Sequence, residues 1–522
     1  MSLTRSPRAA ALLLLLAAAA PPAAAQLPPL TVPRGLLRLD IGGRFDNWDQ
    51  RYRDGIRQEA AADFNRDPVD GHWLPGLASV EEQLRQVTGV QAIALSLGKS
   101  TASTLVNVGT YSIGAAYGLT SRLTVFGTVP IVRVRVRVNF KLDSTNASAG
   151  FNPANPVFGT SAGAAQTGAF ITQLQNALTT LNARLQAGFY DSVPALKAVA
   201  QATLTRGTAL RDGITPLLNT ASFLPLSGSA AATALTRSID SLRSRLGTDL
   251  GISGFTEAPA LPTSRMSSAD FEGYASNPDG PIGALPFTPP LISYLGDIEV
   301  GAGFMWLDHR PAARGGFFAR SVLQGTVRLR TGRLARAEGL FEVPTGDKQP
   351  DVQGDLVTDL SAGRIGARFT ARYVLQQPGR QFRRITLPDQ PISFASTVAE
   401  VQRDPGEIVE GSIEPFLRIG PTLFLVGGVR YWSKAEDKYS YVPGQQPVEG
   451  TSPDVLAIGS KEDGTAFSAG LSFSHDGVQP DGTVGLPMDA SLRWEKVARS
   501  TLGRVPIRES VVLSIRFYRK FL

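Results

Sequence analysis

The chain has few of the residues that carry covalent or metal chemistry. Its 522 residues include no cysteine, three histidines and four methionines. Without cysteine there is no disulfide scaffold, thiolate metal site or cysteine nucleophile. His72, His309 and His475 lie far apart and show no metal-ligand spacing, so we expect no metal and no cofactor. No combination of acid, base and nucleophile stands out, and the sequence does not predict an enzyme.

Long apolar runs are also missing, except at the N-terminus. Residues 1–25 combine Arg5 and Arg8 with an apolar stretch (9–20) and a small-residue cleavage site (23–25), which is the pattern of an export signal peptide. After residue 25 no run reaches the roughly 18 apolar residues of a membrane-spanning helix. The exported chain is therefore expected to be either a soluble protein or a membrane β-barrel, whose apolar residues alternate with polar ones.

Alternation with a period of two is what the sequence has instead. In the first such segment, Leu39 and Ile41 alternate with Arg38 and Asp40. Since successive side chains of a strand point to opposite faces, this pattern predicts one apolar and one polar face. Many of the segments are long enough to cross a bilayer at a tilt. Twelve segments are candidate strands: 36–50, 104–118, 121–140, 292–308, 316–331, 355–375, 380–395, 408–419, 422–440, 464–476, 487–498 and 505–521.

The predicted fold is all-β: an antiparallel transmembrane β-barrel of about twelve strands, with an α-helical insertion between strands three and four. The expected parts are the signal peptide (1–25), the first three strands (26–140), the insertion (141–291) and the remaining strands (292–522). Short connections alternate with long ones, which a β-sandwich does not require. We expect the short ones on the periplasmic side, at 118–120, 309–315, 379, 420–421 and 476–485, and the long ones outside, at 51–103, 141–291, 332–354 and 441–463.

The insertion has a helical pattern. Apolar residues recur at helical spacing in 171–185 and 235–246, and 193–218 between them is compatible with a helix. Two or three packed amphipathic helices are expected, extracellular or capping the lumen, with a further short helix at 79–87. A helical hairpin that only covers the mouth and a functional cap, plug or docking surface both remain open.

Arginine is prominent on the polar faces, and we predict that a water-filled lumen is lined by Arg38, Arg44, Arg133, Arg135, Arg137, Arg328, Arg330, Arg364, Arg368 and Arg372. In the segment 121–140 this prediction requires the apolar phase to slip at Pro130, where we expect a bulge. A net positive lumen would favour anions, whereas a mutually neutralised network would only rigidify the wall. The arginines are spread along strands without stacking aromatics, so nucleic acid is not an expected partner.

Two motifs resemble those of a known family. One is Gly296-Asp297-Ile298-Glu299-Val300-Gly301, and the other is the loop Pro344-Thr345-Gly346-Asp347, followed by Gly354-Asp355. They are similar to motifs of the outer-membrane transporters associated with the meta pathway of phenol degradation, as is the segment 119–130. The resemblance covers about 100–140 and 290–522 and implies an outer-membrane barrel that passes hydrophobic or aromatic compounds, without catalytic residues.

The favoured hypothesis is a channel in the bacterial outer membrane for small molecules, which diffuse passively through the arginine-lined lumen. Membrane lipid, small-molecule solutes and the outer-membrane assembly machinery are the expected partners, and Phe521 lies in phase with the lipid face near the C-terminus. The alternative is a structural or adhesive surface protein in which the barrel is only an anchor. A third possibility is a soluble exported β-sandwich.

Overall fold

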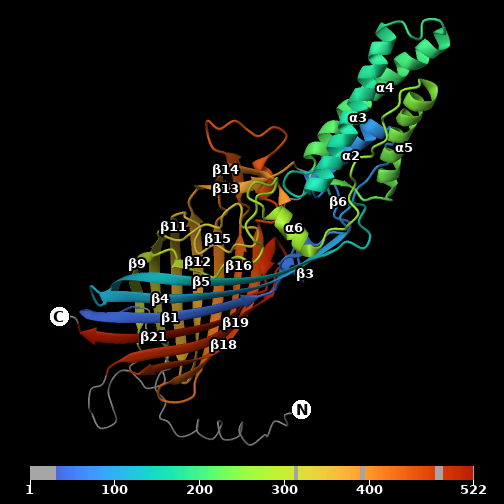
Figure 1. Ribbon diagram of the computed structural model, residues 1–522. Helices are drawn as coiled ribbons and strands as arrows, with labels where there is room; N and C mark the ends of the chain where they lie inside the picture. The colour runs from blue at the N-terminus through green and yellow to red at the C-terminus, as the bar shows by residue number, and fades with distance from the viewer. Residues whose placement is uncertain (1–26, 28–30, 311–315, 388–393, 476–485, 521–522) are drawn as a thin grey trace, which may run out of the picture.

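Twelve long strands close into an antiparallel barrel in the computed structural model, which describes residues 27, 31–310, 316–387, 394–475 and 486–520 (Figure 1). Neighbouring strands in the ring are hydrogen-bonded, and β1 closes it by pairing with both β4 and β21. The predicted signal peptide and Phe521 lie outside the described residues. In ring order the strands are β1 (Leu36–Trp48), β4 (Lys99–Gly118), β5 (Leu123–Asp143), β9 (Glu299–His309), β10 (Phe318–Arg328), β11 (Asp351–Ala362), β12 (Ile365–Gln376), β15 (Ile408–Arg418), β16 (Leu423–Lys434), β18 (Glu462–His475), β19 (Met488–Arg499) and β21 (Glu509–Lys520).

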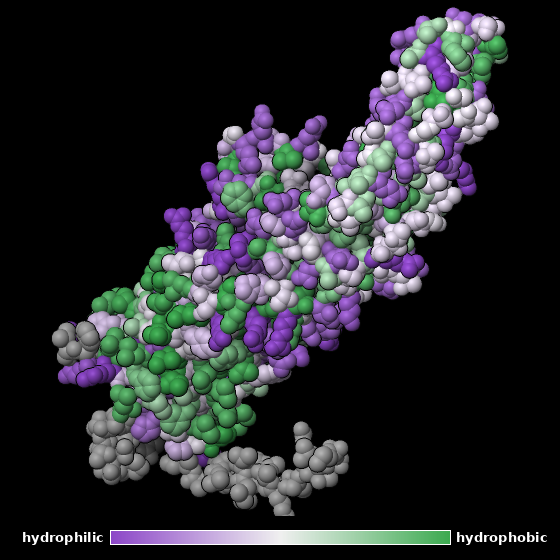
Figure 2. Space-filling model, in the orientation of Figure 1, coloured by the Kyte–Doolittle hydropathy of each residue, from purple (hydrophilic) through white to green (hydrophobic). Residues whose placement is uncertain are grey.

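The two faces of the wall differ in the way the alternation predicts. On β1 the side chain of Ile41 is 52 % exposed, whereas Arg38 on the opposite face is 8 % exposed. Ile41 pairs with Ile113 of β4 and Ile515 of β21, so the apolar row continues from strand to strand on the outer face. Figure 2 shows these hydrophobic side chains gathered over the strands, while hydrophilic ones increase toward the helices. A closed barrel with an outward apolar band satisfies all backbone groups in lipid, and the wall therefore spans a membrane.

The connections define two ends of the barrel. The turn end carries the short links 119–122, 363–364 and 419–422, and the loop end carries the long connections. The predicted short links at 309–315 and 476–485 lie wholly or largely outside the described residues. The long connections at the loop end contain further short strands: β2 (Gln50–Arg53), β3 (Ile56–Glu59) and β20 (Arg504–Pro506) form one sheet, and β6 (Ala149–Phe151) pairs with β7 (Phe223–Pro225).

The prediction of twelve wall strands is confirmed in number, but two of the predicted segments are wrong. The segment 355–375 contains two strands, β11 and β12, because the chain reverses at Gly363, whose φ of +58° favours glycine. The segment 380–395 is not part of the wall. Its residues contribute β13 (Gly379–Ile385), which pairs with β14 (Thr397–Asp404) in a small sheet with β17 (Lys438–Tyr441). Gly379 consequently lies at the loop end and not in a tight turn at the other end.

Helices pack into a bundle that projects from the loop end (Figure 1). The insertion supplies α3 (Ser161–Gln186), α4 (Pro194–Thr220), α5 (Ala230–Ser244) with the π-helical turn η3 (Arg245–Asp249), and α6 (Ser268–Ala275). The first long connection adds η2 (Ala62–Phe64) and α2 (Pro75–Thr88), and η5 (Pro453–Leu456) follows β17. The predicted helical insertion is thus confirmed. No helix in the described part of the chain has the length and apolar content to cross a membrane.

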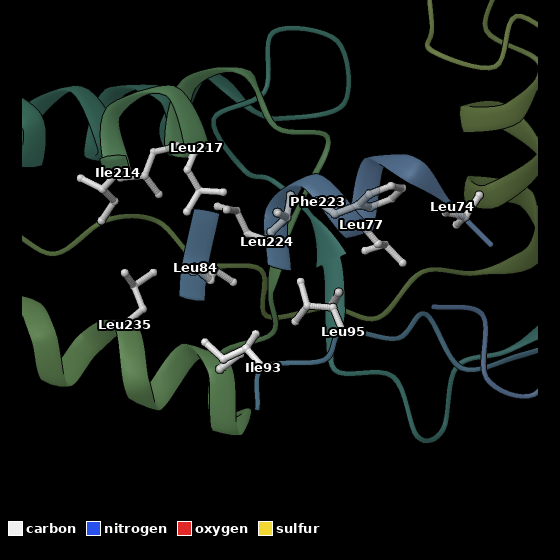
Figure 3. Packing of buried hydrophobic residues seen from close by; sticks show 14 of the residues in the cluster. Leu74, Leu77, Leu84, Ile93, Leu95, Ile214, Leu217, Phe223, Leu224 and Leu235 are labelled. Carbon is white, nitrogen blue, oxygen red and sulfur yellow. The ribbon is translucent and has the colours of Figure 1, made fainter. Parts of the chain in front are cut away.

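The bundle is built on a hydrophobic core that continues to Ala102 of β4 and Leu142 of β5. Leu84 of α2, Leu217 of α4 and Leu235 of α5 are fully buried, and Figure 3 shows their side chains converging. Ile93, which follows α2, and Leu224 of β7 belong to the same cluster. Replacing one of these leucines by alanine would cost about 2–5 kcal/mol, because a cavity remains. The leucine spacing in the sequence therefore reflects the core of the bundle.

Candidate functional site

Charged side chains on the inner face of the wall are joined in ion pairs. Arg44 of β1 contacts Asp46 at 2.9 Å and Glu495 at 3.3 Å, and Arg38 contacts Asp40 at 2.9 Å. These acidic partners sit on the same polar faces as the arginines, because inward positions recur at every second residue. The inner face is therefore largely neutralised by its own residues.

The largest network runs across several strands and is called here the ionic belt. Arg372 of β12 contacts Asp355 at 2.7 Å and Glu410 at 3.5 Å. Arg430 of β16 contacts Glu410 at 3.2 Å and Glu495 at 2.8 Å, which leads on to Arg44. Sequence reasoning missed Arg430 and Glu410, although both lie on the polar faces of their strands. The belt consists of Asp46, Arg44, Glu495, Arg430, Glu410, Arg372 and Asp355.

A second group lies closer to the turn end. Asp359 of β11 contacts Arg320 at 2.7 Å and Arg368 at 2.6 Å, and all three groups are largely buried. Arg493 is paired with Glu414 nearby. A cavity of about 300 Å³ is lined by residues of this region, including Arg368, Glu414, Arg493, Arg516, Ser472 and Leu27. The inner wall thus encloses polar space between strands that are far apart in the sequence.

Residues from the start of the described chain occupy the turn end of the barrel. Leu27 packs against Phe416 and Phe424 of the inner face. The backbone N–H of Val32 donates to Thr124 Oγ1 at 2.8 Å. Leu27 and Val32 therefore fill part of the space inside the barrel at its turn end.

The predicted lumen arginines of β5 face the other way. Arg133, Arg135 and Arg137 are exposed and share the outer face with Ile131, whereas the intervening valines are buried. The pairing of β4 with β5 continues from Thr124 to Asp143 without a shift of register. The expected bulge of β5 near Pro130 does not occur. Instead β5 pairs with two separate segments, with β9 up to Thr128 and with residues 292–295 from Ile131, and the one-residue offset falls in residues 296–298 between them. The prediction for these three arginines is therefore wrong.

Two other predicted lumen arginines do not lie on strands. Arg330 is exposed and follows the last residue of β10, and Arg364 lies in the turn between β11 and β12. The remaining five lie on inner faces: Arg38, Arg44, Arg328, Arg368 and Arg372. Arg328 is paired with Asp351 at 3.2 Å and Glu299 at 3.3 Å.

Aromatic side chains cluster at the loop end and form the group called here the aromatic cap. The ring of Phe394 lies 4.7 Å from Trp73, 5.2 Å from Phe64 and 6.1 Å from Phe287, measured between centroids. Phe341 approaches Phe64 to 4.4 Å. These residues come from four long connections, with Phe64 and Trp73 in the same one, so no periodic pattern in the sequence could have identified them. These rings are buried or partly buried, and they belong to the same hydrophobic cluster as the core of the helical bundle.

The two family-like motifs meet at the edge of this cap. The Asp297 carboxylate accepts hydrogen bonds from the backbone N–H of Gly332 at 2.7 Å and of Asp347 at 3.3 Å. A Cβ at Gly346 would collide with this carboxylate, so the loop needs glycine there. Burial and the nearby Asp347 raise the pKa of Asp297, despite the hydrogen bonds that lower it. The Thr345 hydroxyl donates to the carbonyl of Leu295 at 3.2 Å.

This loop latch, formed by Asp297, Gly332 and residues 344–347, holds the connection after β10 under the cap. Short β8 (Ile292–Leu295) runs along β5 beside the latch. Val343, next to the latch, packs against the buried valines of β5. The sequence indicated the motif residues but not that they contact one another. Among the described residues, no group of three or more acidic or histidine side chains is placed to hold a metal ion.

Comparison with known proteins adds little beyond architecture. No family model and no curated protein matches the sequence. Solved structures that match include an outer membrane channel from Pseudomonas putida F1, with 9 % identity, a TM-score of 0.40 and coverage of 95 % of this chain and 99 % of that chain. The transport unit of the autotransporter AIDA-I from Escherichia coli matches with 7 % identity, a TM-score of 0.29 and coverage of 98 % and 97 %. A Pseudomonas aeruginosa FadL homologue matches with 8 % identity, a TM-score of 0.27 and coverage of 94 % and 91 %.

At TM-scores of 0.40 and below, these matches carry no argument about cargo. The class of protein follows instead from the wall, which is a closed antiparallel barrel with an apolar outer face. Closed antiparallel barrels with an outward apolar band are the spanning structures of bacterial outer membranes. This chain is such a barrel, and the predicted fold class and localisation are confirmed.

Proposed function

We propose that the protein is an outer-membrane channel through which small solutes diffuse passively. The polar space along the inner face, including the cavity of about 300 Å³, carries this proposal, because a channel needs a polar route inside the wall that solutes can occupy. The inner arginines, including Arg44, Arg368 and Arg372, line the route. Since acidic side chains neutralise them, the route favours neutral or weakly charged solutes over anions.

The aromatic cap and the loop latch are the proposed closing element. In outer-membrane barrels short turns are periplasmic and long loops extracellular, so the cap faces the outside. Solute would enter when the latch at Asp297 releases the connection that carries Phe341. The resemblance to transporters of the phenol meta pathway, together with the ring-lined entrance, points to hydrophobic or aromatic compounds as cargo.

A second function is favoured by the helical bundle. It carries a surface pocket of about 710 Å³ between α3, α5 and residues 258–266. In that case the bundle binds a surface partner and the barrel is its anchor.

Single-channel recording in planar bilayers separates the two functions. The absence of cysteine makes single introduced cysteines unambiguous reporters. Ser468 lies on the inner face of β18 and its neighbour Ala469 is exposed on the outer face, so Ser468→Cys and Ala469→Cys form a matched pair. A charged, water-soluble thiol reagent should reduce the current of the first variant and leave the second unchanged.

A variant with a weakened aromatic cap provides a second test in the same recordings. Phe341→Ser combined with Phe394→Ser should raise the open probability, because the rings no longer close the entrance. If neither the natural chain nor this double variant conducts, transport is refuted and the anchor function is left.

A further inference from the structure

A row of cations stands on the outer surface of the wall, where β5 leaves the apolar band. Arg133, Arg135, Arg137 and Lys141 are exposed and follow one another on one face. Alternate residues of a strand lie roughly 7 Å apart, so the three arginines span about 14 Å. Within the described part of the chain none of the three makes an ion pair, whereas the inner arginines of β1, β10 and β12 are paired. The positive charges of this outer row are therefore available to bind an anionic ligand.

The row borders directly on the apolar band. Ile131 precedes Arg133 on the same face and is 45 % exposed. Tyr111 of β4 pairs with Ile131, and its ring lies against Gly109, which pairs with Arg133. Guanidinium groups on a barrel's lipid face are unfavourable at the midplane and tolerated near the interface. The arginines consequently lie at the level of lipid headgroups, and the apolar residues below them lie at the level of acyl chains.

A groove joins these two zones. It has a volume of about 740 Å³ and is lined on its apolar side by Phe45, Tyr111, Val511 and Leu291, and on its polar side by Arg133, Arg135, Asn107 and Asn47. Two acidic residues, Asp46 and Glu509, also line it. Asp46 is paired with Arg44 at 2.9 Å. Glu509 is already engaged by Trp494 Nε1 at 2.8 Å and Lys496 Nζ at 3.4 Å, so the arginines remain available.

We propose that this groove binds a phosphorylated lipid of the membrane leaflet at the loop end. The phosphate contacts Arg133 and Arg135, and an acyl chain lies along Tyr111 and Ile131. Guanidinium binds phosphate oxygens through paired, charge-assisted hydrogen bonds, which a row of arginines supplies in series. The proposal depends on the orientation of the wall in the membrane and is independent of transport.

The test uses the full chain in detergent, with bound lipid counted by native mass spectrometry. The probes are bisphosphorylated lipid A, its dephosphorylated form, and inorganic phosphate as a competitor. Replacing Arg133, Arg135 and Arg137 together by Gln should weaken binding of the phosphorylated lipid at least ~10-fold, because several charge-assisted bonds are lost. The control carries the same charge change on the bundle, at the exposed residues Arg206, Arg237 and Arg245, and should bind as the natural chain does.

Three results would overturn the proposal: unchanged affinity in the triple β5 variant, equal binding of the dephosphorylated lipid, or displacement by inorganic phosphate at concentrations equal to the lipid. Heat-dependent migration of the variant on gels verifies that the barrel has formed. The conductance of the triple β5 variant should equal that of the natural chain, so failure of lipid binding and failure of the channel are recorded separately.

Discussion

Neutralising Asp359 removes the shared partner of two buried arginines. The carboxylate is 1 % exposed and contacts Arg320, 7 % exposed, at 2.7 Å and Arg368, 14 % exposed, at 2.6 Å. In Asp359→Asn the amide keeps the shape of the side chain but removes the negative charge that both guanidinium groups contact. Removing one partner of a buried ion pair costs about 3–5 kcal/mol, mostly because the remaining charge stays desolvated.

The matched control is Asp308→Asn on β9. Asp308 pairs with Arg310 at 3.2 Å, but this arginine is 72 % exposed, so solvent takes over the lost contact. Exposed pairs contribute about 0–1 kcal/mol. Both variants would be unfolded by guanidinium chloride in detergent micelles and followed by tryptophan fluorescence, with the free energy of unfolding extrapolated to zero denaturant. If Asp359→Asn loses no more than Asp308→Asn, the inner ion pairs do not stabilise the wall as argued.

Two further changes test the loop end. Asp297→Ala leaves the N–H groups of Gly332 and Asp347 without their acceptor, which costs about 1–3 kcal/mol of stability for each buried donor. Hydrogen exchange of the amides in 332–347 should therefore accelerate. Unchanged protection of these amides would contradict the loop latch. Burial raises the pKa of Asp63, but Arg51 and two other arginines lower it further, so the net pKa is below its usual 3.8. The stabilisation by Asp63 is present above pH 3.8 and is lost as the pH falls through the lowered value. The protection factor of the amides in 50–66, which is corrected for the pH dependence of chemical exchange, should therefore be constant from pH 7 to 5 and fall below the usual pKa. A fall that persists in Asp63→Asn would rule out this cause.

The alternation of β1 and β12 is enough to predict a wall strand, because every second residue is apolar and the phase is unambiguous. On β5 the residues from Ile131 onward alternate valine and arginine, and the two adjacent apolar residues Ile131 and Val132 allow either phase. The choice is made by tertiary contacts: Val132, Val134 and Val136 pack beneath the connection that carries Val343. A pattern read from one strand contains no information about what covers it.

The same limit explains the candidate site. The inner position of Arg372 follows from its own strand, but its partners Asp355 and Glu410 lie on neighbouring strands and depend on register. The aromatic cap cannot be predicted from the sequence pattern at all. Phe64, Phe341 and Phe394 come from irregular connections, in which apolar residues do not recur at a regular spacing. Gly363, in contrast, is a turn signal within the segment 355–375. Because the prediction of a single strand there takes no account of this glycine, it joins β11 to β12.

The position of Leu27 and Val32 has a practical consequence for handling the protein. Because these residues lie among inner side chains, with Val32 against Ala116 and Tyr518, the chain enters β1 from within the ring. A folded reporter protein inserted directly before Leu27 would have to lie inside the barrel or prevent the ring of strands from closing. Labels and affinity handles belong instead on the link between α3 and α4, where Phe189 is 65 % exposed, far from the bilayer.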